Sequence, residues 1–398
     1  MVKVITGVRR CGKSFLLFNL FREHLEQSNV ENSHIIAIAL DSKENEVYRD
    51  VDRLHERILT LITDDSMHYI LLDEIQMAKG FEAMINSLLR RDNLDIYVTG
   101  SNSKFLSSDI ITEFRGRGDE VNVRPLSFSE FISAYDGDKS DALAEYMDYG
   151  GLPELTKLKT DEQKASYLTA IMATTYLKDI IERNDVKLPY LLENLVNVLS
   201  STACSLVNPT KIKDTLISNG YKAADEDTIV KYICFLTEAF LFEKAERYDV
   251  KGRKYIGALE KYYPVDHGIT NARLNFRQTA DRPHIMENMI YNELRSRGYE
   301  VDIGVVKFRK KIDGRQTQVN AEVDFIARKG SKTTYIQSAY RIDDPEKKEQ
   351  ELRSLLKIND SFRKVVIVGD NMKPNMDDNG ILFIGLMQFL VDGRSLDY

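Results

Sequence analysis

The stretch from Gly7 to Ser14 restricts the possible folds more than any other part of the chain. It reads GVRRCGKS and satisfies the pattern G-x-x-x-x-G-K-[ST]. In such a loop the glycines let backbone N–H groups surround phosphates, Lys13 reaches the β- and γ-phosphates, and the hydroxyl of Ser14 ligates Mg²⁺. A short apolar strand enters the loop and an apolar helix leaves it, so we favour a nucleotide site over a chance match. The residues that we expect to bind the nucleotide are Gly7, Arg9, Arg10, Cys11, Gly12, Lys13, Ser14 and Phe15.

A second signature, of acidic residues, follows a buried strand downstream. Residues 69–72 read Tyr-Ile-Leu-Leu and are followed by Asp73 and Glu74, which is the Walker B pattern. Asp73 would position Mg²⁺, and Glu74 would orient and polarise an attacking water. An acidic pair after an apolar run is a weak signal by itself. Beside the phosphate loop it predicts hydrolysis rather than nucleotide binding alone.

Two further segments predict contacts to the γ-phosphate. Ser101 and Asn102 follow the next apolar strand, where a polar side chain would sense that phosphate; the alternative is a helix cap, which the same residue types favour. Arg115 and Arg117 flank a glycine and would act as an arginine finger, in cis or on a neighbouring subunit, the alternative being a solvent-exposed pair. The expected catalytic residues are Lys13, Glu74, Asn102 and Arg117, and the expected metal ligands are Ser14 and Asp73.

Strands alternate with helices over the first part of the chain. Strand patterns lie at residues 2–6, 35–40, 69–72 and 96–99, and helical patterns lie between them. This alternation predicts a parallel sheet with helices on both faces. From about Leu126 the pattern becomes mostly helical, and a second α/β region begins after about Asp281.

Composition excludes several classes of protein. The length of 398 residues suggests two or three domains, and the net charge of −7 argues against a globally basic nucleic-acid coat. No apolar run reaches the roughly 18 residues of a membrane helix, and the first residues read as a strand rather than a signal peptide. Three scattered cysteines predict no disulfide framework, and six histidines without a Cys/His cluster predict no zinc site. We therefore expect a cytoplasmic protein that does not enter a membrane.

Taken together, these segments resemble the prokaryotic AAA-type P-loop ATPases that carry a C-terminal domain of unknown function. The resemblance rests on GVRRCGKS, LLDEIQ, VTGSNS, FRGR, RPLSFSEF and YGGLPE, and it extends through Glu287-Asn288 and Glu322-Val323-Asp324. It implies ATP binding, hydrolysis with Mg²⁺, and a helical lid around residues 150–153. It does not identify a client.

Residues 208–263 resemble a winged helix in pattern and in family. The recognition helix would run from about Glu226 to Phe240. Acidic residues at its start would repel DNA phosphates, which argues against DNA binding. Two hairpin segments are basic and would contact phosphates. The alternative for the first is a winged helix that docks a protein and has a solvated charged hairpin, and the alternative for the second is a solvated hairpin. The basic residues of these segments are Lys244, Arg247, Lys251, Arg253 and Lys254 in the first, and Lys307, Arg309, Lys310, Lys311 and Arg315 in the second.

The C-terminal region resembles the restriction-endonuclease-like fold. That resemblance implies a metal site at Glu287, Asp324 and Gln337, to which Glu322 would add a ligand. The position of the nuclease lysine holds Ala339, so the charge that develops on phosphorus would lack a fixed cation. Lys348 on the next helix is a possible substitute. We expect a degenerate domain rather than an active nuclease.

The predicted fold is an α/β P-loop AAA-type sheet with a helical lid, followed by a winged helix and a small restriction-endonuclease-like domain. Its expected parts are an ATPase core at 1–135, a lid and connector at 136–200, a winged helix at 201–275 and the α/β domain at 276–398. The predicted function is Mg²⁺-dependent ATP hydrolysis coupled to conformational change on a nucleic-acid or protein partner. The alternatives are a nucleotide-gated DNA-binding switch with little turnover and an ATP-regulated nuclease. DNA and a second copy of the chain are the candidate partners.

Overall fold

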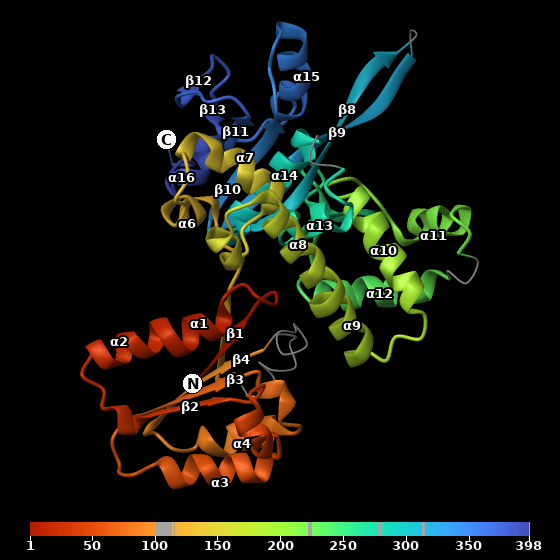
Figure 1. Cartoon of the computed structure of the whole chain (residues 1–398). Helices are drawn as coiled ribbons and strands as arrows, with labels where there is room; N and C mark the ends of the chain where they lie inside the picture. Colours follow the sequence, from red (N-terminus) through yellow and green to blue (C-terminus); the bar gives the residue numbers. More distant parts are fainter. Residues whose placement is uncertain (101–113, 115, 222–224, 278–280, 313–314, 398) are drawn as a thin grey trace. The chain divides into compact units, whose positions relative to one another are not determined.

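A computed structural model describes residues 1–100, 114, 116–221, 225–277, 281–312 and 315–397 (Figure 1). The chain divides into two compact units. The first comprises Met1–Pro125 with Glu238–Phe240, and the second comprises Leu126–Thr237 with Leu241–Tyr398. Among the residues described, no helix has both the length and the hydrophobicity needed to span a membrane.

The first unit contains a five-stranded sheet in which every strand is parallel to its neighbours, which confirms the predicted parallel α/β fold. The strand order is β2-β3-β4-β1-β5, so β4 lies between β3 and β1. The strands are β1 (Val2–Thr6), β2 (Ile35–Ala39), β3 (His68–Asp73), β4 (Leu94–Thr99) and β5 (Gly118–Asn122).

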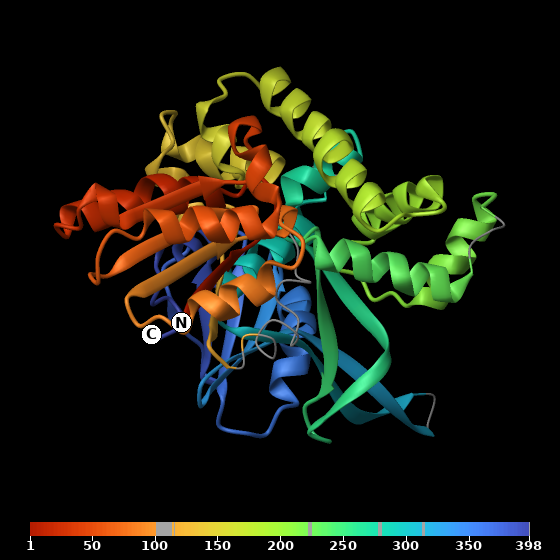
Figure 2. The same cartoon turned by 90° about the horizontal axis from the view of Figure 1, so that it is seen from below.

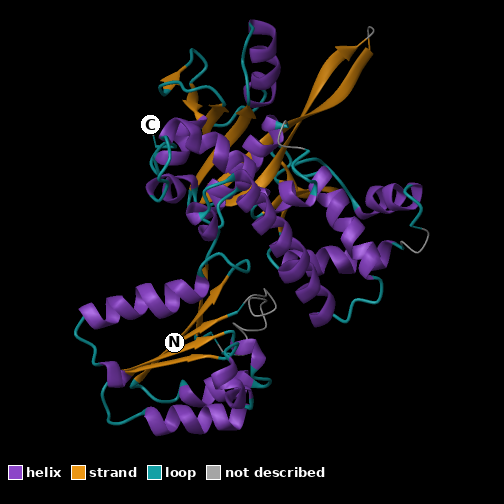
Figure 3. Ribbon diagram, in the orientation of Figure 1, coloured by secondary structure: helices purple, strands orange, loops and turns teal. Residues whose placement is uncertain are grey.

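Helices cover both faces of this sheet (Figure 3). On one face Leu17 and Leu25 pack with Ile5 and Leu71 from the strands, whereas the opposite strand positions pack against the helices of the other face. Because the strands are apolar on both sides, each face requires its own layer of helices. The helices are α1 (Lys13–Phe15) and α2 (Arg22–Gln27), joined by a π-helical segment (Leu16–Phe21), then α3 (Val51–Leu61) and α4 (Phe81–Leu88).

The second unit begins with helices. Between two of them, Gly150 adopts a φ of 79°, and a Cβ there would lie 2.3 Å from Oδ1 of Asp266. The N–H of Gly151 donates to Oδ2 of Asp266 at 2.8 Å, so the Gly-Gly segment packs closely against the residue that caps α13. The helices are α6 (Phe128–Ser133), α7 (Lys139–Tyr149), α8 (Asp161–Ile171), α9 (Lys178–Arg183) and α10 (Pro189–Ser201), with a π-helical segment at Met172–Leu177.

Two more helices and a hairpin follow. A single antiparallel bridge joins Val207, which lies just before α11, to Glu260 on the second hairpin strand. In chain order the region therefore contains helix, short extended segment, two helices and a two-stranded hairpin. The elements are α11 (Pro209–Ser218), α12 (Glu226–Glu238), β6 (Phe242–Asp249) and β7 (Lys254–Pro264).

The hairpin belongs to an eight-stranded mixed sheet of order β12-β13-β11-β10-β9-β8-β6-β7. Its strand β6 pairs in parallel with β8, over Arg247–Asp249 and Ile303–Val305. Figure 2 shows the green β6–β7 hairpin beside the blue strands of this sheet. The later strands are β8 (Glu300–Ile312), β9 (Arg315–Lys329), β10 (Lys332–Ala339), β11 (Arg363–Val368), β12 (Asn375–Met376) and β13 (Ile381–Gly385).

Helices also cover both faces of the second sheet. One core cluster joins Ile290 and Phe389 to strand residues such as Phe325, and another joins Leu352 to strand residues such as Val366. The helices are α13 (His267–Arg273), α14 (Arg282–Ser296), α15 (Pro345–Leu356) and α16 (Leu386–Val391). The β6–β7 hairpin pairs with a strand beyond residue 275, so the expected boundary at 275 divides one sheet. The domain boundaries expected at 135, 200 and 275 stay predictions.

Candidate functional site

The loop between β1 and α1 has a backbone that few residues adopt. Gly7 and Gly12 have φ values of 137° and 102°, and Arg10 has a φ of 66°. A Cβ on Gly7 would lie only 1.9 Å from the carbonyl oxygen of Val123, so no larger residue fits there without movement. Left-handed positions of this kind turn consecutive N–H groups toward one concave side, which is how such loops bind anions.

Lys13 lies beneath this loop. Its Nζ donates to the carbonyl oxygens of Gly7 and Val8, each at 2.9 Å, and only 5% of the residue is exposed. Ser14 and Phe15, the next two residues of the helix, are exposed. The donor set therefore fits a nucleotide with Mg²⁺: an ammonium that can exchange carbonyl oxygens for phosphate oxygens, and an accessible hydroxyl at the start of the helix.

Cys11 anchors the loop to the sheet. Its Sγ donates to the carbonyl oxygen of Val123 at 3.2 Å, and burial raises the pKa of the thiol above its ordinary value. A buried thiol with a raised pKa is mostly protonated at neutral pH and reacts slowly. Arg9 is partly buried and Arg10 is exposed.

The acidic residues predicted after the second strand lie at the carboxyl end of β3. Asp73 is 3% exposed, and Glu74 adopts a left-handed φ of 52°. Thr99, the last residue of β4, touches both: its Oγ1 donates to Oδ1 of Asp73 and accepts from the N–H of Glu74 at 3.0 Å. Nε2 of Gln76 donates to Oε2 of Glu74.

The strand order explains this arrangement. Because β4 lies between β3 and β1, the carboxyl ends of all three strands meet at one edge of the sheet, where the phosphate loop also begins. Ligands of open α/β sheets bind at this edge. The polar residues predicted at this strand end were Ser101 and Asn102, and Thr99 was not among them.

The predicted γ-phosphate contacts have different outcomes. Asn102 and Arg115 lie outside the described residues. Arg117 is described, and it lies next to the start of β5, where its carbonyl oxygen accepts from the N–H of Val2 at 2.9 Å and its guanidinium donates to the carbonyl oxygen of Leu89 at 3.4 Å. That is the amino end of β1, about 15 Å from the phosphate loop at roughly 3.3 Å per residue. The cis arginine-finger role of Arg117 is therefore wrong, and the role in a neighbouring subunit stays a prediction.

Three of the acids expected in the C-terminal region converge, but with a different partner from the expected one. Glu287, Glu322 and Asp324 lie around Lys261 of β7, a residue outside the predicted metal site. Burial lowers the pKa of Lys261, but the three carboxylates outweigh it and raise that pKa above its ordinary value.

Two other residues of the predicted nuclease site lie elsewhere. The side-chain oxygen of Gln337 accepts from Oγ of Ser354 on α15 at 3.4 Å, so Gln337 engages that helix. Nζ of Lys348 lies 4.8 Å from the centre of the Phe383 ring, so it does not replace the missing lysine at Ala339. Both predictions fail because they assumed side-chain directions that the packing of α15 determines.

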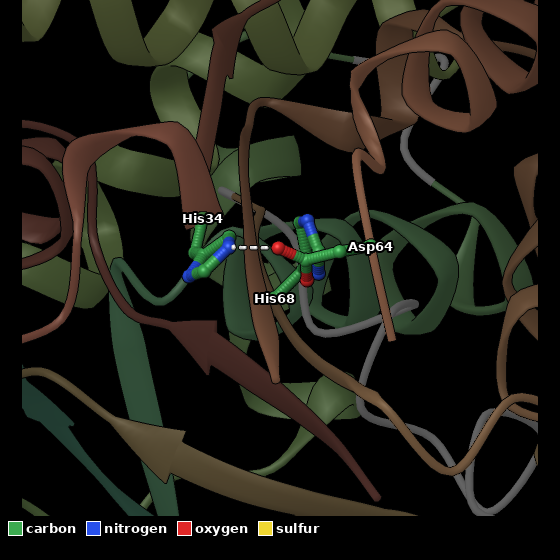
Figure 4. Close-up of side chains that lie close together, drawn as sticks. All are labelled: His34, Asp64 and His68. Carbon is green, nitrogen blue, oxygen red and sulfur yellow. Dashed lines mark hydrogen bonds and ion pairs between the residues drawn. The ribbon is translucent and has the colours of Figure 1, made fainter. Parts of the chain in front are cut away.

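His34, Asp64 and His68 form a cluster that the sequence spacing did not suggest (Figure 4). Their potential ligand atoms lie within 4.8 Å of one another, and Nε2 of His34 is 3.0 Å from Oδ2 of Asp64. Both ring nitrogens of His68 already bond to backbone, at Ser66 O (2.8 Å) and Thr63 N (3.3 Å). The cluster therefore stabilises the turn before β3. It lies at the amino end of that strand, whereas the phosphate loop lies at the carboxyl end of β1.

Some basic residues of the two basic hairpins are paired with acids. In the first, Lys244 pairs with Glu246 at 2.9 Å and Glu260 at 3.1 Å. The basic residues that remain exposed at its turn are Lys251, Arg253 and Lys254. In the second, Lys307 pairs with Asp249 at 2.7 Å. The side chains of residues 310–315 lie outside the description.

Fold and site together define the class of the first unit. Residues 1–132 match the family described as an AAA domain, and residues 140–280 match a domain of unknown function, DUF8612. With its parallel sheet and phosphate loop, the first unit is an ATP-binding domain of the AAA type. The chain belongs to the same family as an uncharacterized protein of Haemophilus influenzae, to which it is 35% identical over 374 residues, or 92% of this chain and 89% of that protein.

Other similar proteins lie at greater distance. The uncharacterized protein MJ1544 of Methanocaldococcus jannaschii is 26% identical over 391 residues, or 93% of this chain and 82% of that protein. Among solved structures, Caenorhabditis elegans PCH-2 is 23% identical over 33% of this chain and 36% of that chain, with a TM-score of 0.25. Cdc6p from Pyrobaculum aerophilum is 11% identical over 71% and 88%, with a TM-score of 0.29. Superpositions this weak do not bear on function.

Proposed function

We propose that the protein hydrolyses ATP with Mg²⁺ at the edge where β1, β3 and β4 end, and that hydrolysis changes its conformation on a partner. The observation that carries this proposal is the pair of hydrogen bonds at the Thr99 hydroxyl, which donates to Oδ1 of Asp73 and accepts from the N–H of Glu74. They hold a buried carboxylate and its acidic neighbour in one orientation next to the phosphate loop. A protein that only binds nucleotide does not need the second acid.

Each residue has a defined task in this proposal. Lys13 and the loop N–H groups bind the phosphates, and Ser14 and Asp73 hold Mg²⁺. Bound there, Mg²⁺ neutralises charge on the phosphate oxygens. Glu74 orients and polarises the attacking water, and the amide of Gln76 restricts where its carboxylate points. Asn102 as sensor of the γ-phosphate and Arg117 as a finger in a second copy complete the proposed set.

The decisive experiment is Glu74→Gln. We expect this variant to bind ATP as the parent does and to lose nearly all turnover, because the amide is isosteric but a poor base. ATP binding is measured by calorimetry and phosphate release by a coupled assay. Glu56→Gln is the matched control, since Glu56 is exposed on α3. Parental turnover in Glu74→Gln would remove Glu74 from the catalytic set.

A second candidate function is nucleotide-gated nucleic-acid binding, in which ATP occupancy rather than turnover controls the partner. It is supported by the order of elements from α10 to β7 and by the Val207–Glu260 bridge, which are consistent with the proposed winged helix. Exposed Lys251, Arg253 and Lys254 at the hairpin turn are suited to phosphate contacts. A rate of hydrolysis that duplex DNA stimulates would favour the motor, and DNA binding without turnover would favour the switch.

A further inference from the structure

Four charged side chains of the second unit meet between β7, α14 and β9, and we call them the Lys261 cluster: Lys261, Glu287, Glu322 and Asp324. Nζ of Lys261 lies 2.8 Å from Oε1 of Glu287 and 2.8 Å from Oε1 of Glu322. The Lys261 side chain is 5% exposed and that of Glu287 is 12% exposed. Asp324, two residues after Glu322 on β9, is 8% exposed.

Without Lys261, the carboxylates of Glu287 and Glu322 would be an uncompensated pair of negative charges that a divalent cation could neutralise. Magnesium, calcium and manganese prefer carboxylate oxygens, at about 2.0–2.6 Å. An ammonium nitrogen 2.8 Å from oxygens of both Glu287 and Glu322 lies where such an ion would have to sit. A second cation beside it would be repelled at short range in a poorly hydrated setting.

Two of the carboxylates also accept hydrogen bonds from donors other than Lys261. Oη of Tyr263 donates to Oε1 of Glu287 at 2.8 Å, so that one oxygen accepts from both the phenol and the ammonium. Oδ2 of Asp324 accepts from the N–H of Ser338 at 2.8 Å. One oxygen of each carboxylate is therefore bonded to a donor group of the protein.

The Lys261 cluster lies where the backbone ladder between the hairpin and the rest of the sheet stops. Strand β6 pairs with β8 over Arg247–Asp249, whereas Lys261 pairs with Ala245, beyond that stretch. Tyr263 on the same strand stacks on Tyr291 of α14, with ring centres 4.0 Å apart and planes 5° apart. Ring stacking and ion pairing thus attach this end of β7 to α14 and β9.

We propose that the ammonium of Lys261 permanently takes the place of a divalent cation among Glu287, Glu322 and Asp324, so that this site joins the β6–β7 hairpin to the C-terminal sheet and binds no catalytic metal. In this proposal the acids predicted to bind a metal form ion pairs with a lysine instead. This inference is independent of ATP hydrolysis by the first unit.

Manganese binding to the full-length, nucleotide-free protein tests the proposal. Free Mn²⁺ is followed by electron paramagnetic resonance, and thermal unfolding is recorded with and without Mn²⁺. We expect Lys261→Met to bind one more Mn²⁺ per chain than the parent and to show a lower unfolding midpoint that Mn²⁺ raises again, because a ligand that binds only the folded state stabilises it. Lys261→Arg, which keeps the charge, should behave as the parent does.

The double variant Lys261→Met/Asp324→Asn is the matched control and should lose the additional Mn²⁺. A folded Lys261→Met that gains no Mn²⁺ would overturn the proposal. Should Lys261→Met fail to fold, the parent decides: Mn²⁺ bound by the parent but not by Asp324→Asn contradicts the proposal, and equal binding by the two supports it. Mn²⁺-dependent DNA cleavage by the parent that Asp324→Asn abolishes would also contradict it.

Discussion

At the proposed nucleotide site, the hydroxyl of one residue, Thr99, bonds to both acidic residues. Thr99 is fully buried and is both donor to Asp73 and acceptor from the N–H of Glu74. A threonine at a strand end is common, and nothing in its local sequence distinguishes it from a residue with a purely structural part. Its importance follows from β4 lying beside β3, which places the hydroxyl against the acidic pair.

We expect Thr99→Val to lower kcat about 10–100-fold, the usual effect of removing a group that orients a metal ligand. ATP affinity should change little, because the hydroxyl of Thr99 bonds to Asp73 and Glu74 and not to the residues proposed to bind phosphates. Thr99→Ser should restore most of the rate, since it returns the hydroxyl. Steady-state kinetics and calorimetry separate the two effects. Thr60→Val, at an exposed hydroxyl on α3, is the control; a Thr99→Val rate equal to the parent's would argue against positioning by Thr99.

At the scale of elements, pairing rather than composition determines which basic segments carry free charge. The hairpin of β6 and β7 contains five basic residues between Lys244 and Lys254, yet Lys244 is neutralised by Glu246 and Glu260. In β8, Lys307 is neutralised by Asp249 of the neighbouring hairpin. In the β6–β7 hairpin, the basic residues that are exposed and can meet phosphates lie at the turn, and they are fewer than the charge count indicates.

Charge reversal at this turn tests its part in nucleic-acid binding. We expect Lys251→Glu/Arg253→Glu/Lys254→Glu to weaken binding to duplex DNA and to reduce the slope of log K against log salt by about 0.9 for each DNA phosphate that the variant no longer neutralises. The measurement is fluorescence anisotropy over a salt series. The control reverses three exposed lysines elsewhere in the second unit: Lys157, Lys159 and Lys178. Equal weakening in both variants would indicate a general charge effect and would contradict a specific role for the turn.

At the scale of the whole molecule, the eight-stranded sheet links parts of the chain that the pattern separates. Strand β6 pairs with β8, and Lys261 of β7 bonds to Glu287 and Glu322, both beyond residue 275. The hairpin and the C-terminal strands therefore share one hydrogen-bonded sheet. The change in secondary-structure pattern along the sequence predicts a domain boundary near residue 275. That boundary would separate strands and ion-paired residues that bond to each other in the structure.

We expect a fragment of residues 126–398 to unfold cooperatively and a fragment of residues 126–275 to be unstable. The shorter piece would expose the unpaired edge of β6 and leave the buried ammonium of Lys261 without carboxylates. Circular dichroism melting and size-exclusion chromatography distinguish the outcomes. A monomeric 126–275 fragment with a cooperative unfolding transition would contradict this expectation and would show that these residues fold independently of the rest of the chain.

Local sequence predicted four of the five strands described in the first unit, its main helices and the phosphate loop, but it did not predict β5 (Gly118–Asn122). Alternating strand and helix patterns recur at β1 to β4, and the spacing of Gly7, Gly12 and Lys13 implied the loop. The errors concern side chains whose neighbours come from distant segments. Gln337 and Lys348 engage α15 and Phe383 instead of the acids, and Arg117 lies at the wrong edge for a cis contact.

The sequence by itself determined the P-loop class, because a phosphate loop is read from consecutive residues whose backbone conformation depends mainly on their own glycines. It also determined where acids would be available, at Asp73, Glu74, Glu287 and Asp324. Only the tertiary structure decided what those acids meet: Thr99 in one unit and Lys261 in the other. Strand order and non-local packing select these partners, and neither is encoded in the spacing of residues along the chain.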